Sequence, residues 1–192
     1  MIILGLGSNL SSSFGDRFHN INFAISCLQN HGIKVIKKSS YYETESYPDK
    51  KNPKFINLVI LVKTNLSPES LATILISIEE KLERKRKRKN DPRTCDIDII
   101  DFDNKVIDFY CNDLKFNVPH KKLRHRNFVL VPLNEILPIW KHPETNENIE
   151  SLLKKLPEEG RKSILKIKNN WYSHLMLDQK ELIKKVKNYN KF

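Results

Sequence analysis

The chain has 192 residues, which fits one domain with its own hydrophobic core and a modest extension but is short for two full domains. Hydrophobic residues make up 39% and charged residues 30%, as in soluble globular proteins, and no run of about 18 apolar residues predicts a membrane span. The formal net charge of +11 favours an anionic partner, either nucleic acid, an acidic membrane surface or a phosphate-rich substrate. Because much of this charge is lysine spread along the chain, its overall value discriminates weakly among these partners.

The cysteines and the first residues bear on the compartment. Cys27, Cys95 and Cys111 show no paired spacing, so they predict neither a disulfide framework nor a zinc site and fit a reducing environment. The first residues carry no basic leader followed by a long apolar segment. We therefore expect no secretion signal and a cytoplasmic location.

The N-terminal part of the chain predicts a strand, a helix and two further strands. Residues 2–9 are an apolar run that ends in Gly-Ser-Asn, and residues 15–31 carry apolar side chains at helical spacing before a glycine. The glycines near residue 7 match neither a Walker loop nor a dinucleotide fingerprint, which favours a strand end packed closely under a helix. Residues 33–42 and 55–63 predict strands, and the polar stretch 43–54 between them predicts a loop long enough for a functional lid.

The next part of the chain predicts a helix, a strand, a hairpin and another helix. Serine, proline and glutamate at positions 67–69 are typical of a helix start, and apolar spacing continues that helix to about residue 84. A strand follows from Asp96. Residues 105–118 then predict a small hairpin, and residues 127–137 predict a helix.

The order strand, helix, strand, strand, helix, strand is the βαββαβ pattern of a ferredoxin-like fold of the α+β class. We expect an antiparallel sheet with helices on one face and an active-site cleft on the other. Residues 1–145 form the predicted domain. Residues 146–192 form a lysine-rich extension, predicted to be helical from Asp178 onward and not to be an independent domain.

The most informative stretch is Asp-Ile-Asp-Ile at residues 96–99. If it is a strand, its alternation places Asp96 and Asp98 on one face and the isoleucines on the other, which can be buried. Two adjacent carboxylates are unfavourable unless a positive charge neutralises them. Mg²⁺, which prefers one or two carboxylates together with phosphate oxygens, would do so. The alternative is a half-exposed edge strand whose acids pair with lysines.

Basic residues stand directly before this acidic pair. Six consecutive basic residues span 84–89, and Arg93 follows them. Acidic groups for a metal and basic groups for phosphate, held together, indicate phosphoryl chemistry on a nucleotide. Phe55 and Asn57 share one face of another strand, where a ring could stack on a flat heterocycle and an amide could read its edge. The alternative is a core phenylalanine and an asparagine bonded to a nearby loop.

Three other functions remain open from these residues. The basic run could belong to a nucleic-acid-binding module, although this leaves the acidic pair unexplained. A ferredoxin-like regulatory domain could bind a nucleotide without turning it over. Another two-metal nucleotidyl or phosphoryl transferase could release different products.

Taken in order, the motifs resemble those of the 6-hydroxymethyl-7,8-dihydropterin pyrophosphokinases of folate biosynthesis. The resemblance covers roughly residues 2–145 and rests on their order and spacing. The motifs are Gly7-Ser8-Asn9, Tyr42-Glu43-Thr44, Phe55-Ile56-Asn57, Ile78-Glu79 with Arg84, Pro92 to Ile99, Val118-Pro119-His120, Arg126-Asn127-Phe128 and Pro132-Leu133.

The resemblance implies transfer of diphosphate from ATP, as co-substrate, to the hydroxymethyl group of the reduced pterin, with release of AMP. It implies two Mg²⁺ ions held by Asp96 and Asp98. The implied catalytic residues are Arg84, Arg93, Asp96 and Asp98; the implied pterin-binding residues are Thr44, Phe55, Asn57, Asp96 and Phe128; the implied ATP-binding residues are Glu79, Arg84, Arg93, Ile99, Lys115, His120 and Arg126. The expected partners are these small molecules, with no nucleic acid and no membrane, and the expected assembly is a monomer or a weak homodimer.

The sequence departs from the family pattern at two loops. Asn90 and Asp91 stand where the family usually has an aromatic residue and a glycine before Pro-Arg, and Glu45 stands where proline is common. Both changes concern loops expected to close over the substrates, and neither touches the acidic pair.

Overall fold

The computed structural model describes residues 1–86, 88 and 90–167, and its main element is an antiparallel sheet. The predicted helix from Asp178 onward lies outside these residues. The strands run in the order β5-β1-β4-β3-β8, and β2 pairs with β4 beside β3. Their bounds are β1 Ile2–Ser8, β2 Lys34–Lys38, β3 Tyr42–Thr44, β4 Phe55–Lys63, β5 Asp96–Phe102 and β8 Leu165–Lys166, with a separate hairpin of β6 Ile107–Cys111 and β7 Leu114–Val118.

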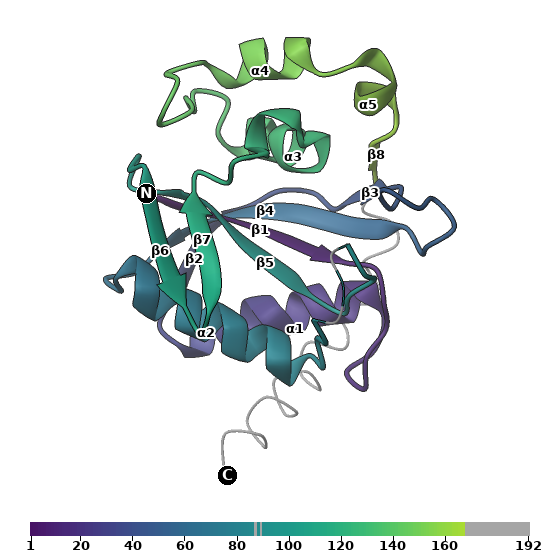
Figure 1. The fold of residues 1–192 in the computed structure, drawn as a ribbon, viewed down its shortest axis with the longest axis vertical. Helices are drawn as coiled ribbons and strands as arrows, with labels where there is room; N and C mark the ends of the chain where they lie inside the picture. Colours follow the sequence, from purple (N-terminus) through teal and green to yellow (C-terminus); the bar gives the residue numbers. More distant parts are fainter. Residues whose placement is uncertain (87, 89, 168–192) are drawn as a thin grey trace.

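Two long helices, α1 (Arg17–Asn30) and α2 (Pro68–Lys81), lie along one face of this sheet (Figure 1). The first is capped by Asp16, whose carboxylate accepts from two backbone N–H groups, and it is followed by Gly32 at φ +75°. The second has Ser67 as N-cap and proline in its first turn. Their apolar sides and the inner side of the sheet form one hydrophobic cluster. The predicted ferredoxin-like arrangement is therefore confirmed.

The strand predicted over residues 33–42 is interrupted. Its first part is β2 and its last residue begins β3. Between them the Ser39 N–H donates to the Val59 carbonyl at 3.0 Å, and the Ser39 hydroxyl accepts from the Val59 N–H, also at 3.0 Å. A side chain thus replaces a backbone acceptor at this point, which ends the regular pairing without exposing the polar groups of β4.

The second face of the sheet is partly covered, which the sequence does not predict. Figure 1 shows α3 (Asn127–Ile136) and α4 (Ile149–Lys155) stacked above it, with the 3₁₀ turn Leu123–His125 leading into α3. These helices and the upper side of the sheet share a second hydrophobic cluster that includes Trp140. The Trp140 Nε1–H donates to the buried Asp101 carboxylate at 2.7 Å, so this carboxylate has a partner.

The chain beyond residue 145 starts as part of this upper layer. Ile149, Leu152 and Leu156 belong to the same hydrophobic cluster as α3. After α4 come the short helix α5 (Glu158–Lys162) and strand β8, which pairs with β3 at the edge of the sheet. The division of the chain at residue 145 stays a prediction. None of the helices in the described part of the chain is both long enough and apolar enough to cross a membrane.

Candidate active site

Strand β5 presents its two aspartates as the alternation predicts. Asp96 and Asp98 are half-buried, whereas Ile97 and Ile99 are buried in the cluster beneath the sheet. The carboxylates therefore lie on the other face, the one that α3 partly covers. Alternation alone orients this pair, because successive side chains of a strand point to opposite faces of the sheet.

The register of the sheet brings other predicted residues onto the same face. Gly7 of β1 lies opposite Asp96 on one side and Asn57 of β4 on the other, and directly paired residues share a face. Gly7 matters because a Cβ atom there would lie 3.0 Å from the Asn57 Oδ1 atom. The glycine thus leaves room between the carboxylate and the amide, and a side chain at this position would fill it.

The aspartates are paired with arginines from three segments. Arg84, which follows α2, lies 2.6 Å from Asp96 Oδ1, and Arg93 lies 2.8 Å from Asp96 Oδ2. Arg126, just before α3, lies 2.7 Å from Asp98 Oδ2. β5 does lie at an edge of the sheet, but the like charges of its two carboxylates are neutralised by guanidinium groups and not by lysines.

Glu79 of α2 connects the arginines and aspartates of this cluster to the helix beneath the sheet. Its side chain is nearly fully buried and accepts from Arg84, from Arg86 and, at 2.7 Å, from the Ile97 N–H. Ile97 lies between the two aspartates, so Glu79 fixes both the strand and the basic segment. Arg86 was not singled out from the sequence, where it is one of six adjacent basic residues with nothing local to distinguish it.

Glu79 and Asp96 compete for Arg84, and their pKa values move apart. Burial raises the pKa of Glu79 to about 7, although Arg84 opposes the shift. Burial also opposes ionisation of Asp96, but Arg84 and Arg93 outweigh it and hold the pKa of Asp96 below its usual value. The carboxylate that faces the upper side of the sheet is thus the one kept ionised near neutral pH.

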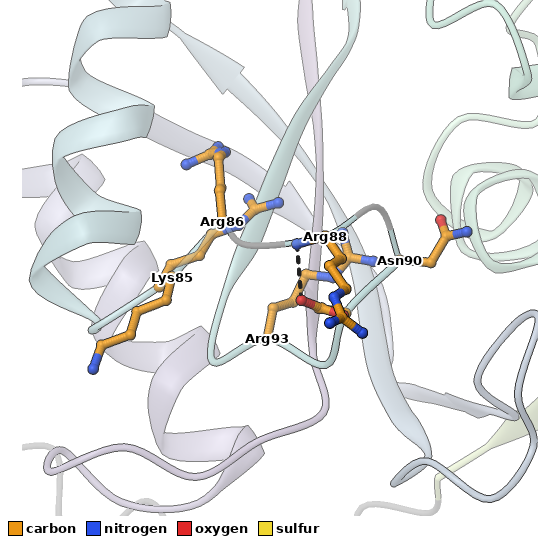
Figure 2. Close-up of a pocket in the computed structure, with 7 residues that line it drawn as sticks. Lys85, Arg86, Arg88, Asn90 and Arg93 are labelled. Atoms are coloured by element: carbon orange, nitrogen blue, oxygen red, sulfur yellow. Dashed lines mark hydrogen bonds between the residues drawn. The ribbon is translucent and has the colours of Figure 1, made fainter.

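The basic segment lines an open pocket of about 350 Å³ beside this cluster (Figure 2). Its lining is Arg84, Lys85, Arg86, Arg88, Asn90, Asp91 and Arg93. Asp91 accepts from the Arg88 N–H at 2.9 Å, and Asn90 has φ +66°. The residues that replace the family's aromatic and glycine therefore form a capped turn, in which asparagine adopts the left-handed conformation that glycine usually supplies.

The predicted ring-binding residues lie next to the charged cluster. Thr44 pairs with Phe55 across β3 and β4, and the Asn57 amide donates to the Thr44 hydroxyl at 2.9 Å. Arg93 lies 5.4 Å from the centre of the Phe55 ring, and Arg126 lies 5.4 Å from the centre of the Phe128 ring. Each of these arginines thus contacts an aspartate and an aromatic ring, which joins the two halves of the site.

Asn9 connects two loops at this site. Its Oδ1 atom accepts from the Arg93 N–H at 2.6 Å, and its amide donates to the Pro53 carbonyl at 3.0 Å and to the Ser46 hydroxyl at 3.2 Å. Ser8 next to it donates to the Thr94 carbonyl at 2.6 Å. The Gly-Ser-Asn segment is a strand end, as the sequence favours, and its polar side chains brace the loops on both sides.

The remaining residues predicted to bind ATP lie in different surroundings. His120 is half-buried, and burial lowers its pKa although Asp98 nearby opposes the shift. The Ile99 side chain is buried on the helix side, so only its backbone faces the strand neighbours. Lys115 lies on the β6–β7 hairpin, with its amine 5.9 Å from the centre of the Tyr110 ring, and the structure does not place it among the aspartates.

The donor set suits a magnesium ion that arrives with phosphate. In the described part of the chain, no cluster of three or more histidine, cysteine, aspartate or glutamate side chains could hold a metal. Asp96 and Asp98 alone offer two carboxylates, which is the number that Mg²⁺ uses when phosphate oxygens and water complete its coordination. Arg93 Nε also finds no hydrogen-bond partner among the residues that the structure describes, which leaves a guanidinium donor for an anion.

The chain is similar in sequence to proteins of folate synthesis. It is 33% identical over 155 residues to a 2-amino-4-hydroxy-6-hydroxymethyldihydropteridine pyrophosphokinase of Synechocystis, a match that covers 80% of this chain and 75% of that protein. It is 36% identical over 158 residues to the folic acid synthesis protein fol1 of Schizosaccharomyces pombe, covering 82% of this chain. The chain spans only about a fifth of the length of that fungal protein, since the match covers 20% of it.

Solved structures and a family profile agree with these matches. The crystal structure of Plasmodium falciparum HPPK-DHPS superposes with a TM-score of 0.64 over 80% of this chain and 44% of that one, at 19% identity, which supports the fold. The profile of the 7,8-dihydro-6-hydroxymethylpterin-pyrophosphokinase family matches residues 3–138. The chain therefore belongs to the 7,8-dihydro-6-hydroxymethylpterin-pyrophosphokinase family.

Proposed function

We propose that this protein is a 2-amino-4-hydroxy-6-hydroxymethyldihydropteridine diphosphokinase, which transfers diphosphate from ATP to 6-hydroxymethyl-7,8-dihydropterin and releases AMP. This would be a step of tetrahydrofolate biosynthesis. The observation that carries the proposal is the pair Asp96 and Asp98, neutralised by arginines and set beside Phe55 and Asn57 on one face of the sheet. Family membership supports the same reaction.

In this reaction the hydroxymethyl oxygen of the pterin forms a bond to the β-phosphorus of ATP. The bond from that phosphorus to the oxygen it shares with the α-phosphate breaks, and AMP leaves with this oxygen and its electron pair. The proton of the hydroxyl group passes to solvent. Negative charge develops on the phosphate oxygens during the transfer, so positive groups aimed at them lower the barrier.

Arg84, Arg93 and Arg126 are placed to bind the phosphates, because they converge on the carboxylates that would hold the metal. Two Mg²⁺ ions bound by Asp96 and Asp98 would neutralise charge on the phosphate oxygens and orient them. The arginines would then exchange a carboxylate partner for a phosphate, which keeps each charge paired. Arg84 and Arg93 are the catalytic arginines in this proposal.

Phe55 and Phe128 would hold the pterin ring between them, one from β4 and one from α3. Asn57 and the backbone near Thr44 would read the edge of the ring, and the hydrogen bond between these side chains fixes the amide for that purpose. Asp96 would lie close enough to contact the pterin as well, since it shares a row of the sheet with Asn57.

The remaining proposed nucleotide contacts are Glu79, Ile99, Lys115 and His120. The contacts of Glu79 support an indirect role for it, through Arg84 and Arg86. Ile99 would act through its backbone. Lys115 would need to reach the nucleotide from the hairpin.

Other features of the protein belong to the same proposal. It would act in the cytoplasm as a monomer or a weak homodimer, on small molecules and without nucleic acid. Residues 1–145 would be the pterin pyrophosphokinase domain, and residues 146–192 would be an extension and not an independent domain.

The experiment that tests the reaction is incubation of the protein with ATP, Mg²⁺ and the reduced pterin, followed by chromatography of the nucleotides. We expect AMP in proportion to pterin diphosphate and no AMP when the pterin is left out. ADP or free pyrophosphate as the product would contradict the proposal. Omission of Mg²⁺ should abolish AMP formation, and its restoration should recover it.

A further inference from the structure

The chain continues past the family-matched residues 3–138 and returns to the predicted pterin site. Residues 157–167, which we call the C-terminal strap, contain α5 and β8. Figure 1 shows α5 beside the upper helical layer and β8 running from it to β3 at the edge of the sheet. The strap therefore spans from the layer that carries Phe128 to the strand that carries Thr44.

One end of the strap is bonded to the start of α3. The Asn127 amide donates to the Gly160 carbonyl and, at 3.2 Å, to the Ser163 hydroxyl. The Oδ1 atom of the same side chain accepts from the Phe128 N–H at 2.7 Å. Asn127 thus links the strap directly to the residue that supplies one of the two predicted stacking rings.

The other end of the strap is bonded to β3. Leu165 and Lys166 pair antiparallel with Glu43 and Tyr42, and the Ile167 N–H donates to the Tyr41 carbonyl at 2.9 Å. Without β8, the short strand β3 would be the edge of the sheet, with one row of backbone groups unpaired. The pairing therefore stabilises β3 just before Thr44.

Glu135 on α3 connects the two ends. Its carboxylate accepts from the Tyr42 hydroxyl at 2.9 Å and from the Ser40 hydroxyl at 2.7 Å, and its Oε1 atom lies 3.0 Å from the Lys166 amine. Strap, α3 and the β3 segment meet at this one side chain. Their relative position is thereby fixed by contacts that involve none of the arginines paired with Asp96 and Asp98.

We propose that the C-terminal strap is a positioning element for the pterin, which sets the distance between Phe128 on α3 and Thr44 on β3. This inference rests on the proposed function. A ring held between two walls loses affinity when one wall moves, because the walls must then be ordered at the moment of binding. Of the three arginines placed to bind the phosphates, Arg84 and Arg93 pair with Asp96 and not with the strap. The third, Arg126, precedes Asn127 in the chain, but its own ion pair is with Asp98.

The test uses the full chain with one variant at each end of the strap. Asn127→Ala removes the bonds to Gly160 and Ser163 together with the acceptor of the Phe128 N–H, and Ile167→Pro, which leaves α3 unchanged, removes the donor to Tyr41. Calorimetry measures the Kd of 6-hydroxymethylpterin and of ATP with Mg²⁺ for each variant. We expect pterin affinity to fall on the order of 3- to 10-fold, as the loss of one to three hydrogen bonds implies, and ATP affinity to stay within about 2-fold.

Lys162→Ala is the matched control. Lys162 lies in the same strap and also forms an ion pair, but its partner Glu158 is in the strap too and both side chains are exposed. This variant should bind both ligands as the unmodified chain does. If it weakens pterin binding as much as the other variants, the effect does not come from the two ends of the strap.

Two results would overturn the inference. Unchanged pterin affinity in both end variants would show that the strap does not position the ring. Equal losses of pterin and ATP affinity would indicate general destabilisation. If the unmodified chain forms no AMP, the proposed function fails and this inference fails with it. If it forms AMP but both end variants keep the pterin affinity of the unmodified chain, only the inference about the strap fails.

Discussion

The two halves of the site are held in place by different interactions. The proposed phosphate half is ordered by charge: Arg84, Arg93 and Arg126 pair with Asp96 and Asp98 at 2.6 to 2.8 Å. The proposed pterin half is ordered by the sheet, since β3 and β4 bring Thr44 within 2.9 Å of the Asn57 amide. In the proposed reaction the charged pairs would be exchanged for a metal and phosphates, whereas the pterin wall would have to be in place before the ring arrives. One half is thus suited to rearrangement and the other to recognition.

The largest expected effect comes from the charged half. Asp96→Asn keeps the size of the side chain but removes the charge that would bind the metal, so we expect turnover to fall by at least about 10²-fold. Stability should also fall, because the Arg84 and Arg93 side chains, only 11% and 22% exposed, lose a charged partner. Steady-state AMP formation and urea unfolding measure the two effects.

Asp108→Asn is the control for this prediction, since Asp108 is an exposed aspartate on the β6–β7 hairpin. It should leave turnover unchanged. If Asp96→Asn retained full turnover, the acidic pair would have no role in the chemistry and the proposed mechanism would be wrong.

The next effect is confined to the pterin half. Phe55→Ala removes one face of the ring site, and we expect pterin affinity to fall by roughly 10-fold or more. ATP affinity should fall much less, because the Phe55 ring approaches the proposed phosphate half through Arg93, which lies 5.4 Å from its centre and keeps its pair with Asp96. Calorimetry with each ligand separates the two, with Ile139→Ala, an exposed apolar residue after α3, as the control. Equal losses of both ligands would show that the two halves are not separable here.

Asn9 sharpens the comparison because its side chain reaches both halves. Asn9→Ala leaves the Arg93 N–H without its acceptor and removes the bonds from Asn9 to Ser46 and Pro53 of the other loop. A buried donor without a partner costs about 1–3 kcal/mol, so we expect a loss of stability of this order. Pterin and ATP affinities should fall together, unlike in Phe55→Ala. Loss of only one affinity would show that Asn9 does not couple the loops.

These cases show which parts of the site the sequence could predict. The orientation of Asp96 and Asp98 follows from local alternation, and the whole of β4 is recognisable from its own composition. The bond from Asn9 to Arg93 joins residues 84 positions apart, and no local pattern signals it. The same holds for the return of the strap to β3, which depends on how α3 and α4 pack on the sheet.

The interruption of the strand at Ser39 shows a second limit. β-branched and aromatic residues favour extended backbone on both sides, and the break depends on a hydroxyl that replaces one acceptor of Val59. The ion pair between Arg86 and Glu79 shows the same limit. The adjacent basic residues have equal propensities, and only their positions around the buried Glu79 in the folded chain distinguish among them.

The smallest effect concerns Glu79, the buried anchor beneath the charged half. Its usual pKa is 4.5, and burial raises it to about 7 in the folded protein. Between these values the folded chain keeps a proton that the unfolded chain has released. The free energy of unfolding contributed by this group therefore falls as pH rises through that window and levels off above it.

Glu79→Gln removes this titration while it keeps the size of the side chain. We expect urea unfolding between pH 4.5 and about 7 to show a shallower decline in stability for the variant than for the unmodified chain. Glu80→Gln, one position along the same helix and exposed, should leave the slope unchanged. An identical slope in Glu79→Gln would mean that Arg84 and Arg86 keep Glu79 ionised throughout the window. The anchor would then be held by charge, like the half of the site above it.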